Sequence, residues 1–138
     1  MTDFLSDDLS SIDLDLFAAT QGWQSQYRLI TQWGKLISPK PSIRIENNLI
    51  RGCELPVWLK HQQNNSLNEF LFDSDSRVIN GLVSLILVNV NGKTSTELAA
   101  LNLHQQLLNW GLEKHLTPSR NNGLRSIIAA IEAAILRP

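Results

Sequence analysis

Cysteine is almost absent from this chain of 138 residues, which contains only Cys53. A single thiol excludes an internal disulfide, a Cys-x-x-Cys redox pair and an all-cysteine metal site. Two roles remain for it. Cys53 is either a small buried side chain that serves packing, the commoner role of a free cysteine, or a thiol that reacts alone.

An excess of charge of one sign is also missing, since 12 basic and 13 acidic residues give a formal net charge of −1. This balance excludes the broad basic field of a sequence-independent nucleic-acid binder. No apolar run approaches the ~20 residues of a membrane span, and the start lacks the pattern of a secretory signal. We therefore expect no nucleic-acid partner, no membrane association and a reducing, cytoplasmic location.

The acidic residues are unevenly placed. Five aspartates precede the first basic residue, Arg28, and these are Asp3, Asp7, Asp8, Asp13 and Asp15. We expect residues 1–12 to form a flexible, solvated acidic terminus. With 43% hydrophobic residues, the chain has enough apolar material for one core, so we expect a single domain over residues 1–138.

Apolar spacing predicts helices near the start and a hairpin after them. Positions three to four residues apart from Trp23 to Ile37 predict a helix, preceded by a short one around residues 14–17. Residues 38–56 contain three prolines and little periodicity, which predicts a long ordered loop of the kind that is often functional. The turn residues 63–66 lie between two strand-like segments, so residues 57–72 predict a hairpin.

The segment Ser76–Val90 is apolar nearly all round, which predicts the central buried helix, with Asp73 to Asp75 as its cap. Thr94 and Glu97 form a capping-box pattern that begins a short helix. Two more helices are predicted over residues 103–110 and from residue 117 onward. The order of elements predicts an α+β fold in which an antiparallel sheet of about three strands packs against helices.

The surroundings of Cys53 predict a loop. Gly52 allows the backbone to turn where a side chain would clash, and Pro56 prevents a helix from forming across the site. Loops are where reactive groups meet partners, so this setting keeps the reactive alternative open.

Four blocks in register resemble the SufE family of sulfur acceptors, from about residue 16 onward. They are Trp23, Tyr27 and Gly34; Asn-Leu-Ile-Arg-Gly-Cys at 48–53 with Val57-Trp58; Asp-Ser-Asp at 73–75 with Gly81-Leu82; and His-Leu-Thr-Pro-Ser-Arg at 115–120 with Gly123-Leu124. Residues 91–94 and 97–98 are more similar to the CsdE branch of the family. The sequence departs from the family pattern at Phe72, Asn80 and Leu55-Pro56.

The resemblance implies a SufE/IscU-like fold and a protein that takes a persulfide sulfur from a PLP-dependent cysteine desulfurase. The thiolate of Cys53 would attack the outer sulfur of the donor persulfide, as in thiol exchange. The protein would stimulate the desulfurase and relay sulfur to an iron–sulfur scaffold or another acceptor, without independent turnover. It would need no cofactor besides the transient persulfide on Cys53, since PLP belongs to the partner, and we expect a monomer.

A docking surface is expected around Cys53, drawing on Glu54, Asp73, Asp75 and Arg120. Arg51 and Arg120 are candidates for favouring the thiolate, although an exposed loop arginine and a surface ion pair explain them as well. Helix capping is the alternative for the two aspartates.

We further expect Leu49 and Leu55 to shield the resting thiol, which loop movement would expose when the desulfurase binds.

Two other function classes stay open. A pure adaptor would dock on a desulfurase and raise its turnover without carrying sulfur. A cysteine hydrolase would pair Cys53 with a histidine base and an acid such as Asp75. The histidines, His61, His104 and His115, have none of the spacings of a zinc motif, so we expect no metal site.

Overall fold

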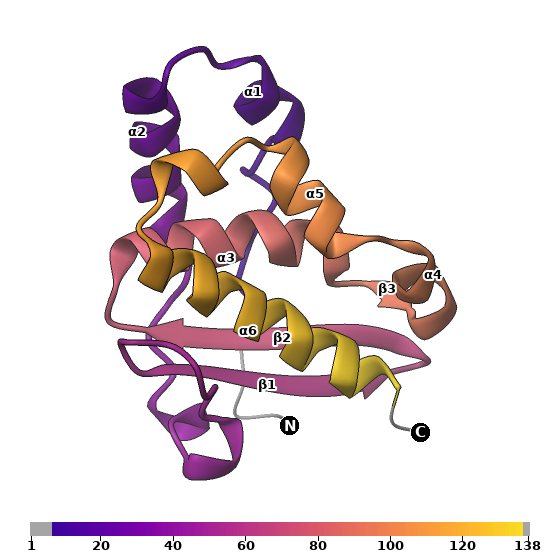
Figure 1. Cartoon of the computed structure of the whole chain (residues 1–138). Helices are drawn as coiled ribbons and strands as arrows, with labels where there is room; N and C mark the ends of the chain where they lie inside the picture. Colours follow the sequence, from indigo (N-terminus) through magenta and orange to yellow (C-terminus); the bar gives the residue numbers. More distant parts are fainter. Residues whose placement is uncertain (1–6, 137–138) are drawn as a thin grey trace.

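The computed structural model describes residues 7–136. It shows an antiparallel sheet packed against helices (Figure 1). Within those residues the sheet has three strands in the order β1-β2-β3, and six α-helices accompany it. This is the α+β arrangement that the order of predicted elements indicated. The bounds are α1 (Leu14–Ala19), α2 (Trp23–Gly34), β1 (Val57–Asn64), β2 (Leu67–Ser74), α3 (Arg77–Val90), β3 (Lys93–Thr94), α4 (Ser95–Ala100), α5 (Leu103–Asn109) and α6 (Pro118–Ile135).

The predicted hairpin is confirmed as β1 and β2. Leu59 lies opposite Phe72, and the two-residue connection Asn65-Ser66 has positive φ values of 53° and 70°. A two-residue loop with both φ values positive matches the twist of paired strands, which explains the tight turn. The predicted loop before β1 contains two single-turn 3₁₀ helices, η1 (Pro41–Ile43) and η2 (Glu46–Asn48).

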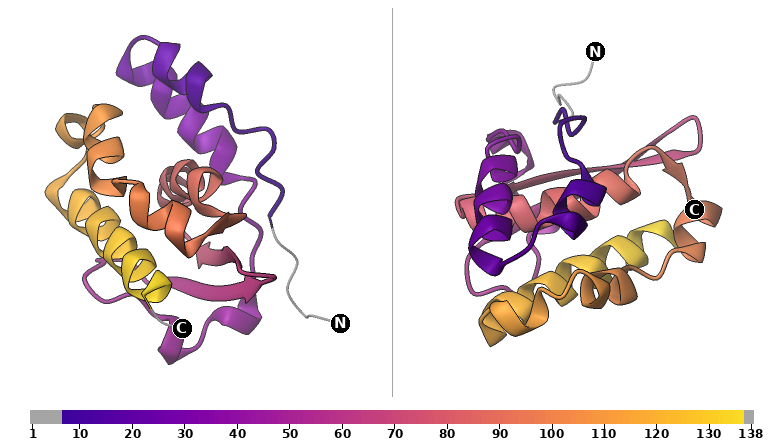
Figure 2. Two further views of the ribbon diagram at one scale, coloured as in Figure 1. Left: turned by 90° about the vertical axis from the view of Figure 1, so that its right-hand side faces the viewer. Right: turned by 90° about the horizontal axis from the view of Figure 1, so that it is seen from above.

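Helix α3 is the central buried helix, as predicted. Figure 2 (left) shows it end on, between the sheet, the α5–α6 side and the α1–α2 side. Its cap differs from the prediction, because the Ser76 side chain accepts a hydrogen bond from the backbone N–H of Ile79, and β2 extends through Ser74. Asp73 and Asp75 therefore do not cap α3, and the Asp73 carboxylate is occupied by Lys40 and Arg44.

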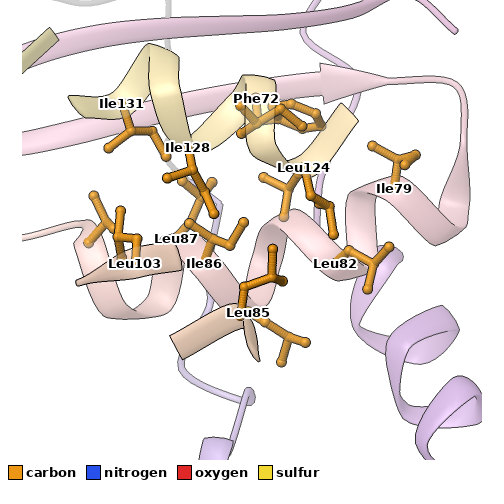
Figure 3. Packing of buried hydrophobic residues seen from close by; sticks show 14 of the residues in the cluster. Phe72, Ile79, Leu82, Leu85, Ile86, Leu87, Leu103, Leu124, Ile128 and Ile131 are labelled. Atoms are coloured by element: carbon orange, nitrogen blue, oxygen red, sulfur yellow. The ribbon is translucent and has the colours of Figure 1, made fainter. Parts of the chain in front are cut away.

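The hydrophobic core lies between the sheet, α3 and α6. Figure 3 shows Phe72 of β2, Leu82 and Ile86 of α3, and Leu124 and Ile128 of α6 converging on one another. All five side chains are almost fully buried, which is the main stabilising contribution in a domain of this size. This core fixes α6 over the sheet and so positions the helix that receives the cysteine loop.

Two glycines allow α2 and α3 to approach closely. A Cβ atom on Gly81 would lie 1.9 Å from the carbonyl oxygen of Ile30, and one on Gly34 would lie 2.3 Å from that of Arg77. Backbone stands where any side chain would go, so only glycine fits at either position. Both glycines belong to blocks quoted above for the family resemblance.

The helices after β3 begin as the sequence predicts. Thr94 and Glu97 form both hydrogen bonds of a capping box at α4. Asn102 caps α5, and the Thr117 side chain accepts from the Arg120 amide at the start of α6, with Pro118 in the first turn. A capping side chain accepts a hydrogen bond from a backbone amide that has no partner within the first turn of the helix. This local chemistry is why the helix starts can be predicted from sequence.

The acidic start differs from the solvated terminus that we expected. The Asp7 side chain is only 5% exposed, and its carboxylate accepts from the Lys40 ammonium at 2.6 Å and from the Ser38 amide at 2.9 Å. The Asp13 side chain caps α1, and Ile12 packs in the core. Residues 1–6, including Asp3, lie outside the described residues. None of the helices in residues 7–136 is long and apolar enough to span a membrane.

Candidate functional site around Cys53

Cys53 lies on the loop between η2 and β1, as its glycine and proline neighbours predict. Its side chain is half-buried against the core, and the thiol donates a hydrogen bond to the Gly123 carbonyl oxygen of α6 with a sulfur–oxygen distance of 3.7 Å. A carbonyl accepts only from the protonated form of the sulfur. The resting site therefore holds a neutral thiol rather than a thiolate.

Three small residues on one face of α6 hold the cysteine loop. Gly52 has a φ of +95°, and a Cβ atom there would lie 2.5 Å from the Ser126 hydroxyl oxygen. The Ser119 hydroxyl donates to the Glu54 carboxylate at 2.5 Å, and Gly123 accepts from Cys53. Spacings of four and three residues place Ser119, Gly123 and Ser126 side by side on the helix. Gly52 is thus favoured by its backbone conformation, and the absence of a side chain there also leaves room for the Ser126 hydroxyl.

A pocket of about 330 Å³ opens beside the thiol. Apolar side chains from the strand, α3 and α6 make most of its wall, and Glu54 and Arg120 are its charged members. The lining residues are Cys53, Glu54, Leu55, Val57, Ile79, Thr117, Ser119, Arg120, Gly123 and Ile127. The pocket unites the cysteine loop with the start of α6, two of the blocks that resemble the family.

Leu49 and Leu55, which we expected to shield Cys53, are not the main residues that cover it. Leu55 lines the pocket but is 54% exposed, and Leu49 is also exposed and does not line it. The buried side chains of Val57, Ile79 and Ile127 enclose the site instead. Sequence neighbours of a loop cysteine point to solvent, whereas the covering surface comes from elements distant in sequence.

Burial raises the pKa of the Cys53 thiol above its ordinary value of 9.0, because an apolar setting penalises the thiolate. We predict that alkylation by iodoacetamide has its midpoint at a higher pH in the folded protein than in denaturant. The folded state favours the neutral thiol, so its contribution to stability is present below the unfolded pKa and is lost as the pH rises through the folded one. A folded midpoint near neutrality would contradict the resting geometry.

The structure separates the two arginines proposed for the site. Arg120 is partly buried at the start of α6 and lines the Cys53 pocket. Arg51 points elsewhere: it is 84% exposed, and its guanidinium lies 3.9 Å from the Glu46 carboxylate. Of the two, only Arg120 is among the residues that line the thiol pocket.

Asp73 does not belong to a docking surface. It is 1% exposed, and its carboxylate accepts from the Lys40 amide and the Arg44 guanidinium, each at 2.8 Å. Asp75 is 87% exposed and pairs with Arg44 at 2.9 Å, which lowers the pKa of its carboxyl. The guanidinium of Arg44 also lies 4.6 Å from the ring centre of Trp58. The Trp58 side chain is half-buried beneath that guanidinium.

Some residues of this region were missed by sequence reasoning. Arg44 and Lys40 gave no signal, because they stand in an aperiodic loop and reach acids about thirty residues away. Ser119 and Gly123 were visible only as parts of the block that resembles the family. Their role as the seat of the cysteine loop depends on how α6 packs.

The three histidines lie apart from the thiol. His61 hydrogen-bonds Asn68 at 2.6 Å, His104 lies 3.4 Å from Glu132, and His115 stacks on the Trp23 ring. None of them lines the Cys53 pocket. A histidine base beside the thiol, which the hydrolase alternative requires, is therefore not part of this arrangement.

Residues 13–135 match the model of the SufE family, described as an Fe-S metabolism associated domain. The chain belongs to the SufE family. An uncharacterized SufE-like protein of Rhizobium etli is 32% identical over 130 residues, which cover 89% of this chain and 88% of that protein. A second, from Rhizobium meliloti, is 30% identical over 132 residues, covering 91% and 94%.

The fold also has a counterpart among solved structures. The solution structure of a hypothetical protein from Thermus thermophilus has a TM-score of 0.71 at 15% identity, and the match covers 95% of this chain and 96% of that one. SufE family membership implies a role in iron–sulfur metabolism and sulfur transfer. Members typically serve as sulfur acceptors in partnership with a cysteine desulfurase rather than as independent enzymes.

Proposed function

We propose that this member of the SufE family accepts a sulfane sulfur on Cys53 from a PLP-dependent cysteine desulfurase. It stimulates that enzyme and relays the sulfur to an iron–sulfur scaffold or another acceptor in the cytoplasm. We place it in the CsdE branch on residues 91–94 and 97–98. The observation that carries the proposal is a single thiol on a loop that rests on α6 beside its own pocket, with no histidine among the lining residues.

The transfer step needs no oxidant or reductant. Cys53 loses its proton to solvent or a partner base, and its thiolate attacks the outer sulfur of the donor persulfide. The sulfur–sulfur bond of the donor breaks as a new one to Cys53 forms, and the donor cysteine leaves as a thiolate. Because this chain has no second cysteine, no internal thiol can attack the new persulfide and release the sulfur.

Delivery requires that the loop leave α6. Two contacts hold it there, the thiol to the Gly123 carbonyl and the Ser119 hydroxyl to Glu54, and a docking surface could replace both. The long thiol bond contributes little, whereas a hydroxyl bond to a carboxylate contributes up to roughly 1.5–3 kcal/mol net, so a docking surface must mainly replace the Ser119–Glu54 contact. Glu54 would then be free to contact the partner. We propose this role for Glu54 together with Arg120, Asp75 and, further out, Arg51.

Arg120 gives the sharpest test of the docking surface. A cation in the first turn of α6 gains nothing from the helix dipole, and Arg120 lines the thiol pocket. We predict that Arg120→Glu lowers desulfurase stimulation at least about tenfold at low salt, because a like charge across an interface slows encounter and weakens binding. Initial rates at two salt concentrations measure this effect.

The matched control is Arg125→Glu, on the same helix but outside the Cys53 pocket, where Arg125 pairs with Glu113. It should change stimulation less than about twofold, since an exposed ion pair contributes little. Equal losses in the two variants, or a loss for Arg120→Glu that merely follows its melting temperature, would assign Arg120 to the fold alone.

The proposed function is tested by alanine production of a cysteine desulfurase supplied with cysteine and no reductant. One acceptor thiol per chain predicts a burst of about one extra alanine per added protein, followed by the unstimulated rate. An adaptor would raise the steady rate with no such limit. A hydrolase would act on thioester or amide substrates without the desulfurase. Either of those outcomes would overturn the proposal.

A further inference from the structure

The outer edge of β1 is an open strand edge. β1 ends the strand order, and for residues 7–136 the pairing on its far side is one bridge, between Leu49 and Trp58. In that bridge the Ile50 amide donates to the Val57 carbonyl at 3.0 Å, so the backbone groups of Val57 point outward. Backbone direction alternates along an antiparallel strand, so the bridge at Trp58 covers the outward groups of residues 57 and 59, and those of residues 61 and 63 point outward beyond it. Such an edge is a template for another strand.

A groove of about 510 Å³ runs beside this edge. Residues 47–51 close one end, and residues 59–61 of β1 form one wall. Small side chains of α6 form the other wall, and these are Ser126, Ala130, Ala133 and Ala134. Figure 1 shows α6 crossing in front of β1 and β2, with the β1 edge facing away from the rest of the sheet. Small residues leave space next to the edge that larger ones would fill.

Charge indicates what fits the groove. Its lining includes two cationic residues, Arg51 and Lys60, and no acidic one, while the Glu46 carboxylate, 3.9 Å from Arg51, lies outside the lining. An acidic segment would be complementary to these side chains. A second copy of the same edge would instead bring the same basic side chains together, which disfavours self-pairing.

We propose that this edge groove binds an extended, acidic peptide segment of a partner protein as an added β-strand. Backbone hydrogen bonds at residues 61 and 63 of β1, beyond the bridge at Trp58, supply affinity, and the basic lining selects acidic side chains. The groove begins just before Cys53 in the chain but lies outside the thiol pocket. It is therefore a second contact surface, and it does not depend on which reaction Cys53 performs.

The test uses a fluorescent synthetic peptide of about eight residues that alternates valine and glutamate, a length typical of strands. A lysine-for-glutamate version tests charge, and a version with alternate amides methylated tests backbone pairing. Binding is followed by anisotropy, and the contacted residues by amide NMR shifts. The glutamate peptide should bind, weaken with salt, and shift the amides of His61 and Gln63, whereas both control peptides should bind at least about tenfold more weakly.

Two alanines of α6 provide matched variants. Ala133 is exposed and lines the groove, whereas Ala129 is exposed and does not. Ala133→Glu should lower the affinity for the glutamate peptide at least about tenfold, because it places a carboxylate in the groove. Ala129→Glu should leave that affinity unchanged. No binding, equal loss in both variants, shifts centred away from β1, or self-association through this edge would each overturn the proposal.

Discussion

Replacing Cys53 by serine is expected to remove all stimulation of a cysteine desulfurase, leaving only the rate of the enzyme alone. The hydroxyl occupies the same space, but it ionises far above neutral pH and cannot form a stable bond to the sulfur offered by the donor. No other thiol in the chain can take over. The measurement is the rate of alanine formation with reductant present, so that wild-type protein turns over repeatedly.

Loss of folding must be separated from loss of chemistry in this variant. Cys53 is half-buried with one weak hydrogen bond, so serine should cost no more than about 1 kcal/mol of stability. The variant should also still bind the desulfurase and compete with wild type for it. Retained stimulation by a folded Cys53→Ser protein would identify an adaptor and remove the acceptor role.

Replacing Asp73 by alanine is expected to lower the free energy of unfolding by about 3 kcal/mol, as for loss of one partner of a buried ion pair. Its carboxylate joins the Lys40 amide and the Arg44 guanidinium, and the Lys40 ammonium in turn holds Asp7 and the Phe72 carbonyl. Alanine leaves a buried amide and a partly buried cation without their acceptor. Urea denaturation of the wild-type and Asp73→Ala proteins measures this difference in the free energy of unfolding.

The control for Asp73 is Asp75→Ala, which removes the exposed partner of the same arginine. That change should leave the free energy of unfolding close to that of the wild-type protein, because solvent screens an exposed ion pair. If the two alanine variants had equal stability, the buried ion pair would not be a structural feature of this protein. If Asp73→Ala instead kept full stability and lost sulfur transfer, Asp73 would return to the docking surface.

The elements of this fold were largely readable because their signals are local. Thr94 with Glu97 and Thr117 with Pro118 mark helix starts by capping chemistry between neighbours. The hairpin followed from strand-like segments around a polar turn, and the length of the apolar run from Ser76 favoured a buried helix although its valines and isoleucines would suit a strand. The role of Asp73 was predicted wrongly because an aspartate shortly before a helix can be either a helix cap or the last part of a preceding strand. The sequence pattern is the same in both cases, and only the burial of the side chain distinguishes them.

The site was predicted less completely because its geometry depends on pairs distant in sequence. Cys53 could be singled out from its uniqueness and its Gly-Cys setting. Its seat on Gly123 joins residues seventy positions apart, and the Glu54–Ser119 contact joins residues sixty-five apart. Arg51 is adjacent in sequence yet turned away from the pocket, whereas Arg120 is distant yet present in it. Periodicity carries no information on such contacts.

The most direct test of sulfur acceptance on Cys53 is the intact mass of the protein after incubation with a cysteine desulfurase and cysteine without reductant. We predict a gain equal to one sulfur atom, located on the peptide that contains Cys53 and removed by a thiol reductant. The Cys53→Ser protein should gain nothing. An unchanged mass for wild-type protein that nevertheless stimulates the desulfurase would contradict the acceptor role.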